Sequence, residues 1–194
     1  MLFLAFLWLL YYTIHSLLAA EFVKKNASRV MGKGFRVYRL AYNLFSILGF
    51  VAIWYYQRQM ALEYVFAPNE LHFLIGGILI ILGIAIGVLV FYQYRWQEFF
   101  GIDQLRVHSP KLASRLVTHG FHKHVRHPLY FAGIFILVGN FLLHTSLQVL
   151  IFTLITLIYL IVGTILEEKK LVNEFGDAYR DYQKKVKMLI PYIF

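Results

Sequence analysis

Residues 128–168 read PLYFAGIFILVGNFLLHTSLQVLIFTLITLIYLIVGTILEE, which is two apolar runs with a short polar break between them. The runs cover 128–143 and 149–166, and only residues 144–148 join them. A helix crosses the hydrocarbon core of a bilayer with about 20 mostly apolar residues. The stretch therefore predicts two antiparallel membrane helices that form a hairpin.

The composition of the whole chain is that of a membrane protein. Of its 194 residues, 60% are hydrophobic and 15% are charged, whereas a soluble domain carries about 45–50% apolar and about 25% charged residues. The chain has no cysteine. This excludes a disulfide scaffold, a thiolate nucleophile, a zinc–thiolate site and an iron–sulfur cluster held by cysteines.

Three further apolar runs, at 2–20, 40–56 and 72–94, bring the expected number of transmembrane helices to five. No internal repeat or linker divides the sequence. We therefore expect one all-α, polytopic membrane domain over residues 1–194. Its first part, 1–94, holds three spans, and its second part, 95–194, holds the hairpin and a C-terminal tail.

The basic residues predict the orientation of the spans. Segments 21–39 and 95–127 and the tail from Glu167 hold six Lys or Arg each, whereas the loop after the second run holds only Arg58 and the hairpin turn holds none. Basic residues stay on the cytosolic side, so we expect the N-terminus outside and the C-terminus in the cytosol. The net charge of +9 then flanks membrane spans, which favours anionic lipid over nucleic acid as a partner. The first run is expected to be a retained anchor, because the basic cluster follows it instead of preceding it.

The segment before the hairpin, residues 116–130, reads LVTHGFHKHVRHPLY. Pro128 suits the first turn of a helix, so Arg126 and His127 are expected at the helix mouth, where backbone amides favour an anion. The alternative is that Arg126 only reaches toward lipid headgroups. The four histidines at 119, 122, 124 and 127 match no standard zinc spacing and have no carboxylate nearby in the sequence, so we expect no metal.

The segment after the hairpin begins with two adjacent carboxylates, Glu167 and Glu168. Ionisable residues at a membrane span are functional candidates, although a solvated pair at a helix end explains them equally well. An amphipathic pattern follows, with apolar or aromatic residues at helical spacing: Leu171, Phe175, Tyr179, Tyr182 and Val186. Gly176 interrupts this pattern and Asp177 is expected to cap a second helix. We expect the two-part helix to fold back over the loop before the hairpin.

Because both segments end adjacent spans on the same side, they are expected to form one cytosolic pocket. Arg126 and His127 would lie on one wall and the two glutamates on the other, with aromatic side chains between them from Tyr130, Phe175 and Tyr179. Carboxylates and aromatic faces bind cations, and arginine binds carboxylates. The pocket therefore suits a ligand that carries both a cation and a carboxylate.

The motif Arg126-His127-Pro128-Leu129-Tyr130, preceded by residues 116–120, resembles the signature of the integral-membrane methyltransferases. That superfamily includes isoprenylcysteine carboxyl methyltransferases, phospholipid methyltransferases and NnrU-like proteins. Residues 167–182 and Pro191 resemble its second signature. Residues 15–19, 38–43 and 100–104 look most like the branch of methanethiol S-methyltransferases.

The resemblance implies S-adenosylmethionine as cofactor, in a cytosolic pocket that the C-terminal helices close. Carried over by position, the cofactor contacts are Leu116, Val117, His122, Arg126, His127, Pro128, Leu129, Tyr130 and Glu167. His122 stands where the family usually has a tyrosine. For the chemistry, His127 or Glu168 is expected to take the proton of the acceptor, and Arg126 to stabilise the resulting anion.

One departure from the family bears on the methyl acceptor. Prenylcysteine enzymes carry an arginine one helical turn before the acidic pair, where this chain has Gly163. A small or lipophilic acceptor, preferably a thiol, fits the sequence better than a prenylated protein does. A phospholipid amine and a prenylcysteine carboxylate are the alternatives. Outside enzymes, an inactive regulatory scaffold or a haem-carrying electron-transfer subunit remains, the latter with His15 as an axial ligand. We expect His15 to bond across helices or to line an acceptor channel.

Overall fold

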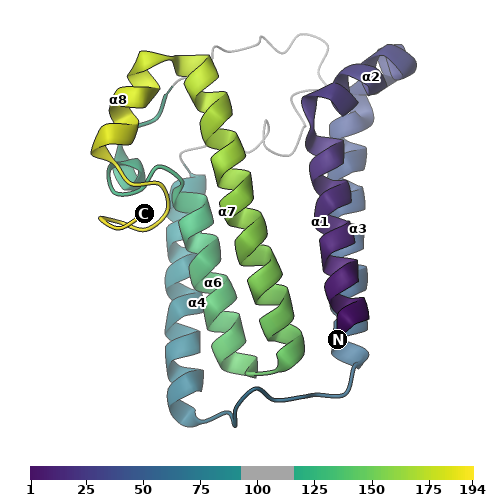
Figure 1. Ribbon diagram of the computed structural model, residues 1–194, viewed down its shortest axis with the longest axis vertical. Helices are drawn as coiled ribbons and strands as arrows, with labels where there is room; N and C mark the ends of the chain where they lie inside the picture. Colours follow the sequence, from purple (N-terminus) through teal and green to yellow (C-terminus); the bar gives the residue numbers. More distant parts are fainter. Residues whose placement is uncertain (93–115) are drawn as a thin grey trace. The chain divides into compact units, whose positions relative to one another are not determined.

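The computed structural model describes residues 1–92 and 116–194, and the chain divides into two compact units (Figure 1). The described part of the first unit is residues 1–63, and that of the second is residues 64–92 and 116–194. Every element in both parts is helical, in agreement with the predicted all-α class. Arg95, Arg106, Lys111, Arg115 and the motif at 100–104 lie outside the described residues.

The first unit consists of two long helices and the segment that connects them: α1 (Leu2–Ala19), α2 (Glu21–Met31), η1 (Gly32–Val37) and α3 (Tyr38–Gln59). Polar bonds join α1 to α3. The buried Trp8 indole donates to the Gln57 side chain at 3.1 Å, and the Tyr11 hydroxyl donates to the Ser46 carbonyl at 3.1 Å. Inside a membrane such bonds satisfy polar groups that lipid cannot.

His15 lies in the same interface of α1 and α3. Its Nδ1 is 3.0 Å from the Ser46 hydroxyl and its Nε2 is 2.9 Å from the Tyr42 hydroxyl. The expectation that His15 forms a hydrogen bond across helices is therefore met.

The second unit is built on three long helices that lie side by side, α4 (Glu70–Phe91), α6 (Pro128–His144) and α7 (Leu147–Phe175) (Figure 1). The helices α4 and α6 approach closely through small residues. A Cβ atom placed on Gly76 would lie 2.8 Å from the Gly139 carbonyl oxygen, and one placed on Gly83 would lie 2.7 Å from the Ala132 carbonyl oxygen. Such contacts between small residues are how membrane helices pack tightly.

The five predicted apolar runs each coincide with a helix. The stretches Leu2–Ala19, Glu21–Gln59, Glu70–Phe91 and Leu147–Phe175 contain helices that are long and apolar enough to cross a membrane. Pro128–His144 is a shorter apolar helix of 17 residues. The described residues thus contain four candidate spans by length and composition, plus this shorter helix.

The helix α7 continues well past its apolar part. It has 29 residues, more than the about 20 that cross a bilayer, so the part after Leu166 projects beyond the hydrocarbon core. It ends at Phe175; the next residue, Gly176, has a φ of +58° that favours glycine, and α8 (Asp177–Lys185) follows. The expectation that Asp177 caps α8 is wrong: Gly176 occupies the cap position, and the Asp177 carboxylate accepts a 2.8 Å bond from Arg180.

Candidate functional site

The loop before α6 and the chain after α8 run side by side. The backbone N–H of Arg126 donates to the Lys187 carbonyl at 2.9 Å, and that of His127 donates to the Met188 carbonyl at 3.1 Å. The buried Tyr182 hydroxyl donates to the His122 carbonyl at 2.6 Å. The prediction that the C-terminal helix folds back over this loop is therefore confirmed.

Glu168 is the centre of a polar cluster between these segments. Its Oε1 accepts bonds from Arg126 Nε at 2.8 Å, His127 Nε2 at 2.7 Å and the Tyr179 hydroxyl at 2.6 Å. Its Oε2 accepts from Arg126 Nη2 at 2.7 Å and Gln183 Nε2 at 2.5 Å. These five residues are called the Glu168 cluster below. It joins the loop before α6 to α7 and α8.

The Arg126 guanidinium, like the Glu168 carboxylate, is fixed by several hydrogen bonds. Besides its two bonds to Glu168, its Nη1 donates to the carbonyl oxygens of Gln183 and Val186. Four of its five N–H groups are thus used inside the protein. Fork-like pairing of guanidinium and carboxylate is the strongest form of such an ion pair.

The Glu168 cluster lies outside the apolar part of α7, and its surroundings determine the protonation states of Glu168 and Tyr179. Burial raises the pKa of the Glu168 carboxyl, but the bonds from His127, Arg126 and Tyr179 outweigh it and hold that pKa well below its usual range. Burial and the bond to Glu168 raise the pKa of the Tyr179 hydroxyl far above its usual range. Tyr179 is therefore a hydrogen-bond donor at neutral pH, and Glu168 is a carboxylate.

Glu167 lies in different surroundings from its neighbour. Its side chain is 43% exposed, compared with 10% for Glu168, and its Oε2 lies 3.8 Å from Nδ1 of His127. The buried His127 ring thus stands between two carboxylates, with the Tyr130 ring 5.7 Å away. Both acidic residues and both members of the Arg–His pair meet at this point, as the sequence predicts.

Of the remaining predicted residues, His122 and Pro128 adjoin this centre. His122 is buried, its Nδ1 donates to the Arg126 carbonyl at 3.2 Å, and burial lowers its pKa. Pro128 is buried at the first position of α6. The other lining candidates are half-buried: Leu116, Val117, Leu129, Tyr130 and Phe175. Among the residues described, no three of His, Asp and Glu are placed to hold one metal ion.

Two contributors to the cluster were not predicted. Gln183 lies one helical turn after Tyr179 on α8, and both side chains donate to Glu168. The backbone of residues 186–188 pairs with the loop before α6. The four-residue spacing of Tyr179 and Gln183 was the available signal, since such residues share one helix face.

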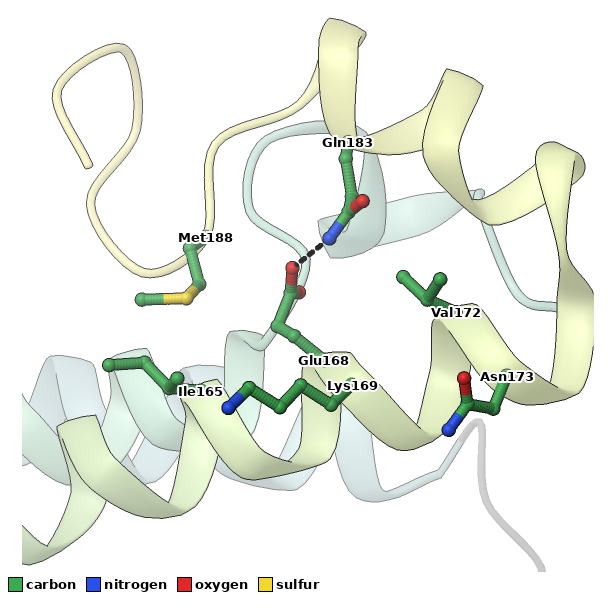
Figure 2. A pocket seen from close by; sticks show the side chains of 7 residues that line it. All are labelled: Ile165, Glu168, Lys169, Val172, Asn173, Gln183 and Met188. Carbon is green, nitrogen blue, oxygen red and sulfur yellow. Dashed lines mark hydrogen bonds between the residues drawn. The ribbon is translucent and has the colours of Figure 1, made fainter.

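A pocket of about 380 Å³ adjoins the cluster. Figure 2 shows the seven side chains that line it: the Gln183 amide is bonded to Glu168, Lys169 extends toward Ile165, and Asn173 lies on the side of Val172. The apolar side chains of Ile165, Val172 and Met188 complete the lining.

Comparison with known proteins places the chain among methyltransferases. Residues 71–178, more than half of the chain, match the model of the family described as phospholipid methyltransferase. A protein named methanethiol S-methyltransferase from Crocosphaera subtropica is 29% identical over 187 residues, which is 92% of this chain and 70% of the relative.

Other relatives match over shorter stretches. The methanethiol S-methyltransferase of Pseudomonas deceptionensis is 41% identical over 98 residues, 48% of this chain and 36% of the relative. The protein-S-isoprenylcysteine O-methyltransferase of Schizosaccharomyces pombe is 41% identical over 85 residues, 40% of this chain and 34% of the relative. No solved structure matches the chain significantly.

Proposed function

The chain belongs to the phospholipid methyltransferase family, and from this premise we propose that it transfers a methyl group from S-adenosylmethionine to a small or lipophilic acceptor, favourably a thiol. The observation that carries the proposal is the meeting of the two motifs: His127, at the start of α6, lies between Glu168 and Glu167 of α7. His127 and Glu168 are 41 residues apart in the sequence, and the bonds from α8 and the following chain hold them together in space.

The exposed groups fit the charges of this cofactor. S-Adenosylmethionine carries a sulfonium, an ammonium and a carboxylate. The half-exposed Glu167 carboxylate suits a cation. The first turn of α6 has no side-chain cap within the described residues, and the N-terminus of a helix favours a carboxylate. Leu116, Val117, His122, Leu129 and Tyr130 would line the remainder of the site.

The two glutamates then have different roles. The cofactor supplies an electrophilic methyl group, and its departing thioether needs no acid. A thiol acceptor must lose its proton to react. Glu168 is a poor base, because five donors occupy its oxygens and hold its pKa low.

His127 is the better proton acceptor. If its Nε2–H donates to the Glu168 carboxylate, the lone pair on Nδ1 is left to accept the proton, and Glu168 stabilises the charged ring that results. Arg126 acts on the acceptor only through the electrostatic field of its positive charge, because its N–H groups are bonded to Glu168 and to backbone carbonyls. We therefore assign catalysis to His127, and positioning to Arg126 and Glu168.

The choice of a thiol rests on two observations. Several relatives carry the name methanethiol S-methyltransferase. At Gly163, where the resemblance to prenylcysteine enzymes leads one to expect an arginine, a Cβ atom would meet nothing within 4 Å among the described residues. Without that arginine a substrate carboxylate loses its partner. The distribution of basic residues further supports a site that faces the cytosol.

Calorimetric binding of S-adenosylmethionine and S-adenosylhomocysteine to the detergent-purified protein tests the proposal. We expect both to bind, and Glu167→Ala to weaken binding by about tenfold, which is about 1.4 kcal/mol. Glu174→Ala, which removes the same charge from the end of α7, serves as the control and should bind as the wild type does. Folded wild-type protein that binds neither compound would overturn the proposal. Binding would then justify assays of labelled methyl transfer to thiols, phospholipid amines and prenylcysteines.

A further inference from the structure

The pocket in Figure 2 lies on a different face of α7 from the proposed cofactor carboxylate. Ile165, Lys169 and Val172 recur at helical spacing and line the pocket together. A helix turns by about 100° per residue. Glu167 is therefore rotated by about 200° from Lys169, so it points away from this pocket.

The lining combines apolar side chains with one cation. Ile165, Val172 and Met188 are apolar, and Asn173 lies one helical turn after Lys169. Glu168 also lines the pocket, but Arg126 compensates its charge at 2.7 Å. No ion pair to Lys169 occurs among the described residues, which leaves the pocket with a net positive charge. An anion with an apolar part attached fits this lining.

The position of the pocket relative to the membrane indicates the source of such a ligand. The apolar run of α7 ends at Leu166, so the pocket extends from the last apolar turn of the span into the polar part. Phosphate groups of a bilayer lie at this level, and basic residues beside a span attract anionic lipid. Lys170 and Lys187, next in sequence to lining residues, add positive charge.

From these observations we propose that the pocket binds one anionic phospholipid from the surrounding leaflet. Its phosphate contacts Lys169, and the beginning of an acyl chain packs against the apolar lining of Ile165, Val172 and Met188. This lipid is not the methyl acceptor, because the pocket faces away from Glu167. Since Met188 follows α8, the bound lipid ties the C-terminal segment to α7.

Native mass spectrometry of the full chain, released from mixed phosphatidylglycerol and phosphatidylcholine vesicles, tests this site. We expect the wild type to retain one phosphatidylglycerol in preference to phosphatidylcholine. Lys169→Gln should reduce that preference about fivefold, equivalent to about 1 kcal/mol. Lys170→Gln removes the same charge from a neighbouring residue that does not line the pocket, and should keep the preference. Val172→Trp, which fills the pocket, should lose the lipid while keeping the helical content of the wild type.

Three results would overturn the proposal. Equal losses in Lys169→Gln and Lys170→Gln would mean diffuse attraction to a basic surface. Retention that survives Val172→Trp would place the lipid elsewhere. Inorganic phosphate that protects the wild type against thermal unfolding as well as phosphatidylglycerol does would identify a soluble anion as the ligand. None of these measurements depends on methyl transfer, so the site and the proposed activity stand or fall separately.

Discussion

At the scale of single residues, the adjacent glutamates Glu167 and Glu168 have the same charge but different roles. Glu168 accepts bonds from four side chains and is nearly buried, whereas Glu167 is half-exposed and meets only His127, at 3.8 Å, as an ion-pair partner among the described residues. A buried ion pair that loses one partner costs about 3–5 kcal/mol, because the other charge stays buried without compensation. Glu168 is therefore expected to stabilise the fold of the C-terminal segment, while Glu167 is expected to act on the ligand.

The acid dependence of stability follows from the low pKa of Glu168. We compare thermal unfolding of the wild type and Glu168→Gln in detergent as a function of pH. A carboxyl whose pKa is lowered on folding stabilises above its unfolded pKa, and this contribution is lost as pH falls toward the folded pKa. The stability advantage of the wild type over Glu168→Gln should thus shrink as the pH falls below about 4.5.

The difference between the two proteins removes effects that they share, such as that of His122, whose pKa is lowered by burial. Glu167→Gln serves as the matched control and should unfold close to the wild type throughout. A wild type no more stable than Glu168→Gln at neutral pH would contradict the stabilising role of the cluster.

The roles of these residues were only partly predictable from sequence. The two motifs end adjacent spans, so their meeting could be predicted from topology alone. Which glutamate is buried depends on the rotation of α7 and on where α8 docks, and neither follows from the motif. Gln183 has no charge and belongs to a polar helix. Its contact with Glu168 can therefore be predicted only once it is known that Tyr179, on the same helix face, bonds to Glu168.

At the scale of elements, α4 and α6 pack through a reciprocal contact of glycines. A Cβ atom on Gly76 would lie 2.8 Å from the Gly139 carbonyl oxygen, and one on Gly139 would lie 2.7 Å from the Gly76 carbonyl oxygen. Backbone cannot move aside as a flexible side chain does. The helices must separate to accept any side chain at either position.

Adjacent glycines of α4 provide a matched pair of variants for this contact. Gly76→Ala is expected to destabilise the second unit by about 1–3 kcal/mol through overpacking. Gly77→Ala meets nothing within 4 Å among the described residues and should be neutral, or stabilising by up to about 1 kcal/mol, because alanine favours a helix. Thermal unfolding followed by circular dichroism measures both. Equal effects of the two substitutions would refute the close packing.

Apolar runs located the long helices, but their bounds shifted where polar residues continue a helix. The run 149–166 became Leu147–Phe175, since Glu, Lys and Leu after the span are strong helix formers. Likewise, residues 21–39 were expected only as a basic connection, yet they form α2 and η1 before α3 begins. Apolar content alone therefore does not predict where a helix ends once it extends beyond the membrane into water.

At the scale of the whole molecule, large apolar side chains face outward on the long helices of both units. Phe6 of α1 is 54% exposed, Ile81 of α4 is 68% exposed and Ile158 of α7 is 62% exposed. A water-soluble surface rarely carries such apolar area. Lipid is the medium in which these helices are stable, and the distribution of basic residues then predicts which ends face the cytosol.

Single-cysteine labelling tests this orientation directly, because the chain contains no cysteine of its own. Glu63→Cys lies after α3, in the loop that holds only one basic residue, and Lys185→Cys lies at the end of α8. Both positions are exposed. A membrane-impermeant maleimide added to intact cells that express the protein should label Glu63→Cys, and should label Lys185→Cys only after the membrane is opened. The reverse pattern would put the Glu168 cluster outside the cell. The proposed site would then face a compartment separate from the cytosolic supply of S-adenosylmethionine, and the methyltransferase proposal would need a different donor.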